Sequence, residues 1–356
     1  MILFIDARKG GDFTLDAMWA GLILKHGIEN VIDYGPCVEK HREGIPVVTG
    51  NAEKDYGAER RSLGYVPGCT NMPIYTRWQI NEMIKSGQIS TIFLDEREES
   101  YILYLQLSAK WYNIPVVVIA GHDRFWNVNP DRPLDILRNY YGKNLVGLFA
   151  DNWRDSYSES SYIYPMSYAT NFDHLWDVSR RQEWLENKVY DVCFMGYNSH
   201  GDRAKFVDHI VKKYEGNTNC VFVEKRPNIM DTFIRKNEYF KKMAQSKICI
   251  NLRGAAECGK ALRFYEIPYV GSFMLSQRFD GRQVHPFVEV TNAHMRMISD
   301  CTYFDSFEEL DSKISWFLKE HFEREQIASN GHEHAMKFHT ARARVDYIYE
   351  CLNGQI

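Results

Sequence analysis

Short apolar runs alternate along the chain with longer amphipathic stretches. In the first half these runs occupy residues 1–6, 31–34, 91–94, 116–120 and 145–150. Consecutive apolar positions are typical of strands that are covered on both faces of a parallel sheet. Helical spacing is found between them at residues 14–26 and 98–112. This alternation predicts an α/β domain built on a parallel sheet.

A second series of the same kind begins near residue 191. It predicts strands at 192–196, 220–223 and 248–252, helices at 204–214 and 237–245, and a helical C-terminal tail at 306–318 and 324–351. The segment 162–175 contains Pro165 and shows no clean period, so we interpret it as the connection between two domains. The predicted organisation is an N-terminal Rossmann-like domain at 1–164, a linker at 165–188 and a second Rossmann-like domain at 189–340. A C-terminal helix at 341–356 follows, and it is a candidate to pack against the N-terminal domain.

One strand-turn-helix unit carries most of the candidate chemistry. Gly254 breaks an apolar strand, and a helix is expected to begin near Gly259 at the carboxyl edge of the sheet, where its free N–H groups favour an anion. Lys260 and Arg263 share one face of this helix, and Glu266 follows one turn later. The pattern predicts cations for a phosphate group and a carboxylate for ribose hydroxyls.

Two other interpretations of this unit stay open. Residues 254–260, directly after Arg253, match the first seven positions of the P-loop pattern, but Ala261 stands where a Ser or Thr hydroxyl should bind magnesium. A P-loop nucleotide hydrolase is therefore the weaker alternative. Lys260, Arg263 and Glu266 also have the spacing of a solvated helix face with salt bridges, which would carry no function.

Composition limits the function classes. The chain has 356 residues, 45% of them hydrophobic, which is enough for two domains of ordinary size. A formal net charge of −4 argues against a broadly basic surface that coats DNA. The sequence contains no apolar run long enough to span a membrane and no signal-peptide pattern at its start, so we expect a cytoplasmic protein without a transmembrane segment.

Cysteine and histidine positions do not suggest a metal centre. The eight cysteines show no CxxC spacing, and we interpret them as reduced core thiols. Asp95 and Glu96 are adjacent and do not form a DxD pair, while His332, His334 and His339 are assigned to a solvated tail. No metal site is predicted.

Four segments, in order, give the chain a resemblance to a known family. They are YPMSYATNF, DVCFMGYNSHGDR, SKICINLRG with ALRFYEIPYVGSFMLS, and the stretch from FDSFEELDSKISWFLKEHF to HTARAR. Together they resemble the CgeB-like and exostosin-like branches of the GT-B glycosyltransferases (glycosyltransferase group 1). The resemblance covers residues 160–350, and over residues 1–150 it is architectural only.

The resemblance implies two Rossmann-like domains that face each other across a cleft, with a nucleotide-sugar donor on the C-terminal domain and an acceptor on the N-terminal one. Arg263 would neutralise the diphosphate, Glu266 would bind the ribose, and Gly196 with Arg203 would border the nucleotide pocket. Arg253 and Lys260 are further donor-binding candidates. A UDP-sugar is the favoured donor. No metal or other cofactor is required, since cations and helix N–H groups can stabilise the leaving diphosphate.

The acceptor side depends on fewer residues. His122 and Asp123 follow the strand at 116–120, where some GT-B families carry a His-Asp that contacts the transferred sugar. We expect one of them to act on the sugar or as a base, with Asp12 in the glycine turn as second choice; a structural loop or N-cap role is the alternative. The acceptor is open between a glycan, a protein, a small molecule and a hydroxymethylated DNA base. The alternative to a glycosyltransferase is a protein with a GT-B-like fold that has no catalytic activity and serves as a binding or coat protein.

Overall fold

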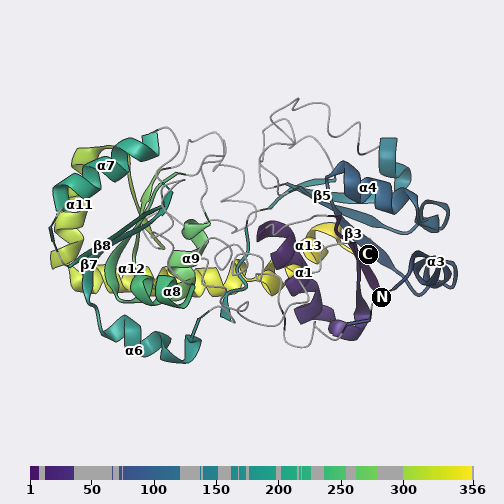
Figure 1. Ribbon diagram of the computed structural model, residues 1–356, viewed down its shortest axis with the longest axis horizontal. Helices are drawn as coiled ribbons and strands as arrows, with labels where there is room; N and C mark the ends of the chain where they lie inside the picture. Colours follow the sequence, from purple (N-terminus) through teal and green to yellow (C-terminus); the bar gives the residue numbers. More distant parts are fainter. Residues whose placement is uncertain are drawn as a thin grey trace. The chain divides into compact units, whose positions relative to one another are not determined.

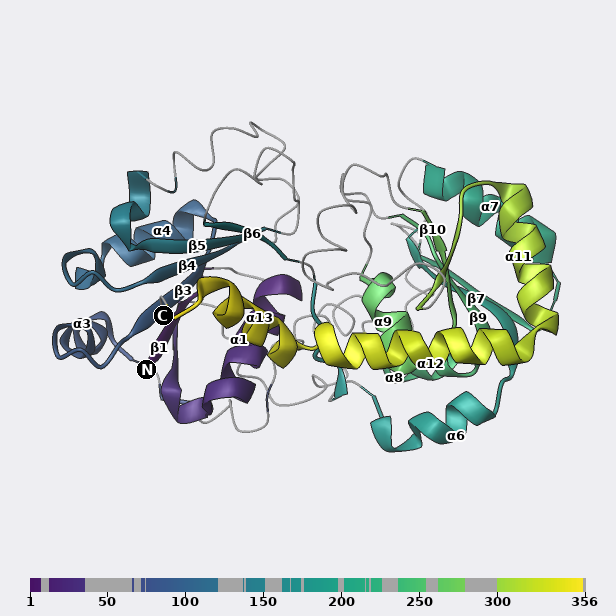
Figure 2. The same cartoon turned by 180° about the vertical axis from the view of Figure 1, so that it is seen from behind.

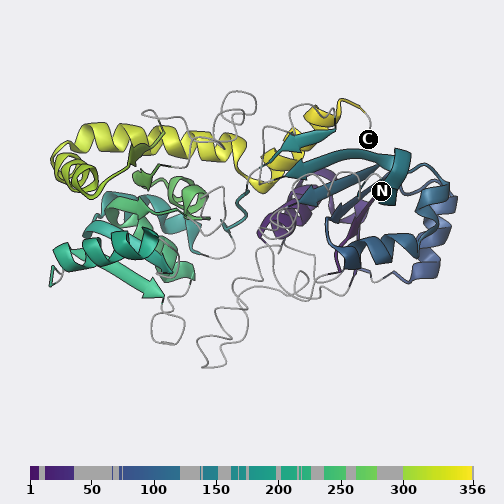
Figure 3. The same cartoon turned by 90° about the horizontal axis from the view of Figure 1, so that it is seen from above.

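The structure is a computed structural model, and the residues that it describes form two compact units. It describes residues 1–7, 13–35, 66, 72–73, 75–120, 137, 139–150, 162–166, 168–173, 176–197, 202–214, 216–217, 219–225, 236–253, 262–278 and 300–354. The first unit holds the described residues of 1–171 and 340–356, and the second holds those of 172–339 (Figure 1). Both chain termini therefore belong to the first unit (Figure 3).

The first unit is built on a parallel sheet. Its described strands are β1 (Ile2–Ile5), β2 (Val31–Tyr34), β3 (Thr91–Asp95), β4 (Val116–Ala120), β5 (Leu145–Ala150) and β6 (Ile163–Pro165), in the order β2-β1-β3-β4-β5-β6. Every strand pair is parallel, and the apolar residues of β1, β3 and β4 are buried. The five predicted strands are confirmed. The sixth, β6, lies in the segment interpreted as a connection, and its Pro165 is tolerated because β6 is at the sheet edge.

Helices cover this sheet. Those described are α1 (Phe13–His26), α3 (Arg77–Lys85), α4 (Glu98–Leu105) and α13 (Ala341–Leu352), with 3-10 turns η1 (Ile28–Asn30), η5 (Ser108–Trp111) and η6 (Gly142–Asn144). α13 packs on α1. Gly21 permits this contact, because a Cβ there would lie 2.7 Å from Val345 Cγ2 and against the Ala341 carbonyl. α3 was not predicted, although a capping box of Thr76 and Gln79 marks its start.

The second unit is also built on a parallel sheet, with five strands among its described residues. Its described strands are β7 (Tyr190–Tyr197), β8 (Cys220–Lys225), β9 (Ser246–Asn251), β10 (Met274–Gln277) and β11 (Thr302–Phe304), in the order β11-β10-β9-β7-β8. Its helices are α6 (Arg181–Glu186), α7 (Asp202–Tyr214), α8 (Lys236–Ala244), α9 (Arg263–Val270), α11 (Phe307–Lys319) and α12 (His321–Phe338), with the 3-10 turn η9 (Val178–Arg180). The predicted α/β class with parallel sheets and a helical C-terminal tail is confirmed.

The assignment of three histidines to a solvated tail was wrong. α12 packs along α9 (Figure 2), and this contact covers one face of α12. His334 and His339 are buried, with His334 Nδ1 2.9 Å from the Asp300 carboxylate. His332 is half-buried, and its Nδ1 lies 3.0 Å from the Pro268 carbonyl oxygen. The sequence of α12 alone does not show which helix covers it.

The strand order places a topological switch point in each sheet. In the second unit the chain runs from β7 to β8 on one side and then to β9 on the other, so the switch point lies between β7 and β9. In the first unit the same reversal lies between β1 and β3. Ligands of open α/β sheets bind at the carboxyl ends of the strands beside such a point.

Candidate functional site

An arginine fills the space beside a glycine at the switch point of the second unit. Gly196 is buried near the carboxyl end of β7, and a Cβ there would lie 2.6 Å from Nη1 and 2.8 Å from Cζ of Arg263. The same guanidinium lies over the Phe194 ring, with Cζ 5.4 Å from the ring centroid. Only a residue without a side chain at position 196 leaves room for this arrangement.

Arg263 presents buried donors at this point. It is the first residue of α9, and its Nε and Nη2 atoms are buried with no hydrogen-bond partner among the residues that the structure describes. A buried, unpaired charged donor is costly, and the guanidinium fork matches phosphate oxygens well. Leu262, the N-cap of α9, has no side-chain oxygen to cap the helix, so the N–H groups of Arg263 and Phe264, together with the positive end of the helix dipole, favour an anion as well.

Arg203 holds the neighbouring strand end in place. It is buried at the start of α7, and its Nη2 donates to the carbonyl oxygens of Leu252, at 3.1 Å, and Arg253. Burial, and then the charge of Arg263, lower the pKa of Arg203 to about 9. The two cations are therefore close enough to repel each other, and a bound anion would relieve this repulsion.

Arg253 is turned towards β10. Its Nε donates to the Arg278 carbonyl, and its backbone N–H donates to Gln277 Oε1 at 3.1 Å. The structure therefore brings together Gly196, Arg203 and Arg263, whereas the Arg253 side chain binds the backbone after β10.

Glu266 lies one turn after Arg263 and is 2% exposed. Its Oε2 accepts a hydrogen bond of 2.6 Å from the Tyr239 hydroxyl on α8. A carboxylate held in this way can accept hydrogen bonds from ribose hydroxyls. Sequence reasoning missed Tyr239, because a tyrosine at helical spacing carries no signal of the carboxylate that it will contact.

Several predicted site residues lie outside the described residues. They are Asp12, His122, Asp123, Gly254, Gly259 and Lys260. The helix expected to begin near Gly259 is described from Arg263 onwards. β4 ends at Ala120, so the strand that precedes His122 is placed as predicted.

The switch point of the first unit gathers buried carboxylates. Asp6 follows β1 and Asp95 ends β3, and both are fully buried. Arg97 Nη1 lies 3.1 Å from Asp95 Oδ2. Asp95 is the last residue of β3, and α4 begins at Glu98, where the sequence predicts the start of a helix. Asp6 was not singled out.

The residues that the structure describes contain no helix that is both long and apolar enough to cross a membrane. They also contain no cluster of three or more His, Cys, Asp or Glu side chains arranged to hold a metal ion.

A family model described as "Glycosyl transferase-like" matches residues 203–350. This range begins at Arg203 and includes Arg253, Arg263 and Glu266. The chain has no match among curated proteins.

Solved structures match over the full length. Anabaena HepE in complex with UDP has a TM-score of 0.54 at 12% identity, covering 99% of each chain. An alpha-glucosyltransferase in complex with UDP and a 13-mer DNA with a central A:G mismatch has a TM-score of 0.57 at 8% identity, covering 99% of this chain and 98% of that one. Sucrose-phosphate synthase from Thermosynechococcus elongatus has a TM-score of 0.50 at 9% identity, covering 100% and 99%.

Identities this low establish the fold alone, and the family model adds the domain type. Together they confirm the predicted GT-B fold and the predicted glycosyltransferase class. Residues 203–350 of this chain are therefore a glycosyl transferase-like domain within a GT-B fold.

Proposed function

We propose that this protein transfers a sugar from a nucleotide-diphosphate sugar, with a UDP-sugar as the favoured donor, to a hydroxyl acceptor, and that it needs no metal ion. The observation that carries the proposal is the Arg263 guanidinium. It lies against Gly196 at the switch point, has buried donors without a partner among the described residues, and is one helical turn from the buried Glu266. Such a site suits a diphosphate next to a ribose.

Each residue has a role that follows from its chemistry. The bond between the anomeric carbon and the diphosphate breaks as the acceptor oxygen bonds to that carbon, so negative charge develops on the nucleoside diphosphate. Arg263, with Arg203 and the first N–H groups of α9, would stabilise that charge in place of a metal. Glu266 would hold the ribose. Lys260 and the glycines Gly254 and Gly259 remain proposed contacts of the diphosphate.

The acceptor hydroxyl must lose its proton, and we assign this step to the first domain. His122 or Asp123, after β4, or Asp12, before α1, would take the proton or hold the transferred sugar. In this proposal residues 1–164 form the acceptor domain and residues 189–340 the donor domain, with 165–188 between them in sequence and 341–356 as the C-terminal helix.

The solved relatives support the choice of a uridine nucleotide. HepE was crystallised with UDP-glucose, and the alpha-glucosyltransferase with UDP. The likeness to both is one of fold, so the acceptor stays open between a glycan, a protein, a small molecule and a hydroxymethylated base such as those of phage DNA. We place the reaction in the cytoplasm.

A thermal-shift screen tests the proposal. Nucleoside diphosphates, nucleotide sugars and triphosphates are added with and without magnesium, because a ligand that binds only the native state raises Tm. We expect a shift with UDP or UDP-sugars in the absence of magnesium. A shift with a triphosphate and magnesium alone would support a P-loop hydrolase instead, and no shift with any nucleotide would favour a non-catalytic relative.

A further inference from the structure

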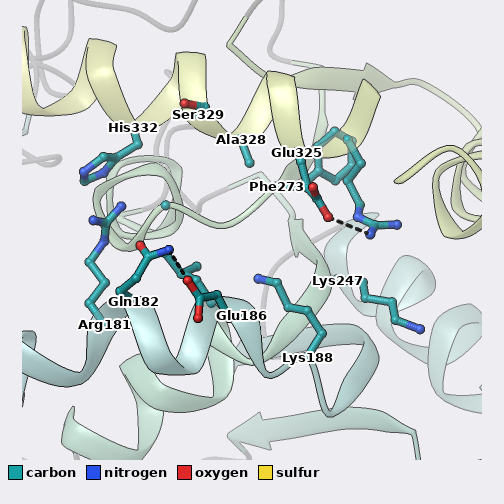
Figure 4. A pocket seen from close by; sticks show the side chains of 13 residues that line it. Arg181, Gln182, Glu186, Lys188, Lys247, Phe273, Glu325, Ala328, Ser329 and His332 are labelled. Carbon is teal, nitrogen blue, oxygen red and sulfur yellow. Dashed lines mark hydrogen bonds and ion pairs between the residues drawn. The ribbon is translucent and has the colours of Figure 1, made fainter. Parts of the chain in front are cut away.

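A second pocket lies at the amino-terminal edge of the sheet of the second unit, opposite the carboxyl edge that Arg263 borders. It has a volume of about 510 Å³ and is lined from α6, α12 and the amino ends of the strands (Figure 4). Lys188 precedes β7 by two residues, and Lys247 is the second residue of β9. Gly196 and Arg263 border the carboxyl ends of these strands, so the two sites are on different edges of the sheet.

The buried charges of this pocket are cations. Arg324 of α12 is 5% exposed, and Arg181 and Lys188 are half-buried. Among the described residues Arg181 and Lys188 have no ion-pair partner, and the carboxylate nearest to Arg324 belongs to the exposed Glu325, at 3.9 Å. Buried charges in proteins are normally paired, so a pocket with unpaired cations suits an anionic ligand.

The acids of the pocket do not neutralise these cations. Glu186 is exposed and accepts a 2.8 Å hydrogen bond from Gln182 on the same helix. Lys247 is already paired, with its Nζ 2.6 Å from Asp191. Figure 4 shows Arg181 and Lys188 on the α6 side and His332 on the α12 side of the same space.

Burial disfavours the charged form of the basic side chains that line this pocket. Burial lowers the pKa of Lys188 to about 8 and lowers the pKa values of Arg181 and Arg324. Burial, and then the charge of Arg181, also lower the pKa of His332. The loss of solvation outweighs the opposing effect of the nearby carboxylates, which are Glu325 and Asp191 for Arg324, Glu325 for Lys188 and Glu333 for His332.

Three of the cations also cap helices. Lys188 Nζ donates to the Ala244 carbonyl at the end of α8, and Arg181 Nε donates to the Val270 carbonyl at the end of α9, both at 2.7 Å. Arg324 donates to the Phe317 carbonyl near the end of α11. A helix end carries only about half a negative charge, and each contact uses one donor of the three on a lysine or the five on an arginine. Positive charge and free donors therefore remain.

We propose that this pocket binds a small phosphate-bearing anion at a site separate from the donor site. Guanidinium forks and an ammonium group recognise phosphate oxygens through charge-assisted hydrogen bonds, and the volume is that of a small-molecule site. α9 connects the two sites, since Arg263 is its first residue and Val270, which Arg181 contacts, is its last. This anion site is independent of which nucleotide sugar serves as the donor.

Titration calorimetry with inorganic pyrophosphate tests the inference. The pocket variant is Arg181→Gln with Lys188→Gln, in which the amides can still donate to the helix carbonyls. The matched control is Arg180→Gln, next in sequence to Arg181 but exposed and paired with Glu183 at 2.6 Å. Arg263→Ala removes the main cation of the proposed donor site. Thermal melts establish that each variant folds, and each single pocket substitution is measured if the double variant does not.

We expect pyrophosphate binding that persists in Arg263→Ala and Arg180→Gln and weakens at least about tenfold in the pocket variant. Binding that is lost in Arg263→Ala and unchanged in the pocket variant would overturn it, and the cations would then be helix caps only. No binding in any form of the protein would also overturn it. Because Arg263→Ala separates the two sites, failure of the donor assignment is recognised independently.

Discussion

Gly196→Ala tests whether β7 sets the position of the Arg263 guanidinium. The added Cβ would lie 2.6 Å from Nη1, 2.8 Å from Cζ and 2.9 Å from Nη2, whereas an ordinary contact is at least 3.4 Å. The guanidinium must therefore move by about 0.8 Å, the difference between 3.4 and 2.6 Å. A hydrogen bond of about 2.9 Å that lengthens by this amount is no longer a hydrogen bond. At least one charge-assisted bond to a phosphate oxygen is lost.

Loss of such a bond costs about 1.5–3 kcal/mol, which raises Kd for UDP by about 10- to 150-fold. The free energy of unfolding should change by less than about 1 kcal/mol, because alanine suits an extended strand better than glycine and the atoms that must move end a flexible side chain. Titration calorimetry measures Kd, and urea denaturation measures stability.

Gly147→Ala is the matched control in the other sheet. Gly147 is in β5, and a Cβ there would lie 2.7 Å from Leu352 Cδ2, so this variant should lose stability and keep its UDP affinity. If Gly196→Ala folds and binds UDP as tightly as the wild type, the reasoning about the guanidinium is refuted.

Three further outcomes follow from the structure. Tyr239→Phe removes the hydroxyl that holds Glu266, and we expect KM for the donor to rise about five- to tenfold with little change in KM for the acceptor. If steady-state kinetics give the variant the same donor KM as the wild type, Tyr239 is not part of the donor site. Burial lowers the pKa of Lys188 to about 8 in the folded chain, against 10.5 in the unfolded chain, so between these pH values the unfolded chain binds more protons. The free energy of unfolding should therefore rise with pH across this range, by about 3 kcal/mol more than in Lys188→Met. Parallel pH profiles of the two proteins in urea melts would contradict this. Gly21→Ala places a Cβ 2.7 Å from Val345 Cγ2, and this crowding between α1 and α13 should lower the free energy of unfolding by about 1–3 kcal/mol. An unchanged midpoint of denaturation would show that the two helices can adjust.

The sequence predicted the sheets well because their strands are buried on both faces. β2, β4 and β5 have the predicted bounds, since consecutive apolar residues leave little choice of conformation or position. β6 and β11 were missed because a strand of three residues carries too few positions to show a period. α6 was missed for the same reason, with six residues in the helix.

The candidate site was only partly visible in the sequence. Arg263 and Glu266 could be singled out because they are close in sequence and have helical spacing, and the structure places both on α9, whereas Lys260 lies outside the described residues. The contact of Gly196 with Arg263 and that of Tyr239 with Glu266 join residues far apart in the chain, so no local pattern reports them. The cations of the second pocket are spread over three elements and were invisible for the same reason.

The central claim is that arginine side chains, without a metal, bind the diphosphate of the donor. Titration of UDP into the protein in EDTA, with Arg263→Ala in parallel, tests this claim most directly. Binding should persist in EDTA for the wild type and weaken at least about 100-fold in the variant. Tm should be preserved, because the variant removes two buried donors, Nε and Nη2, that have no hydrogen-bond partner among the described residues. Binding that requires magnesium, or equal affinity in the two proteins, would contradict the claim.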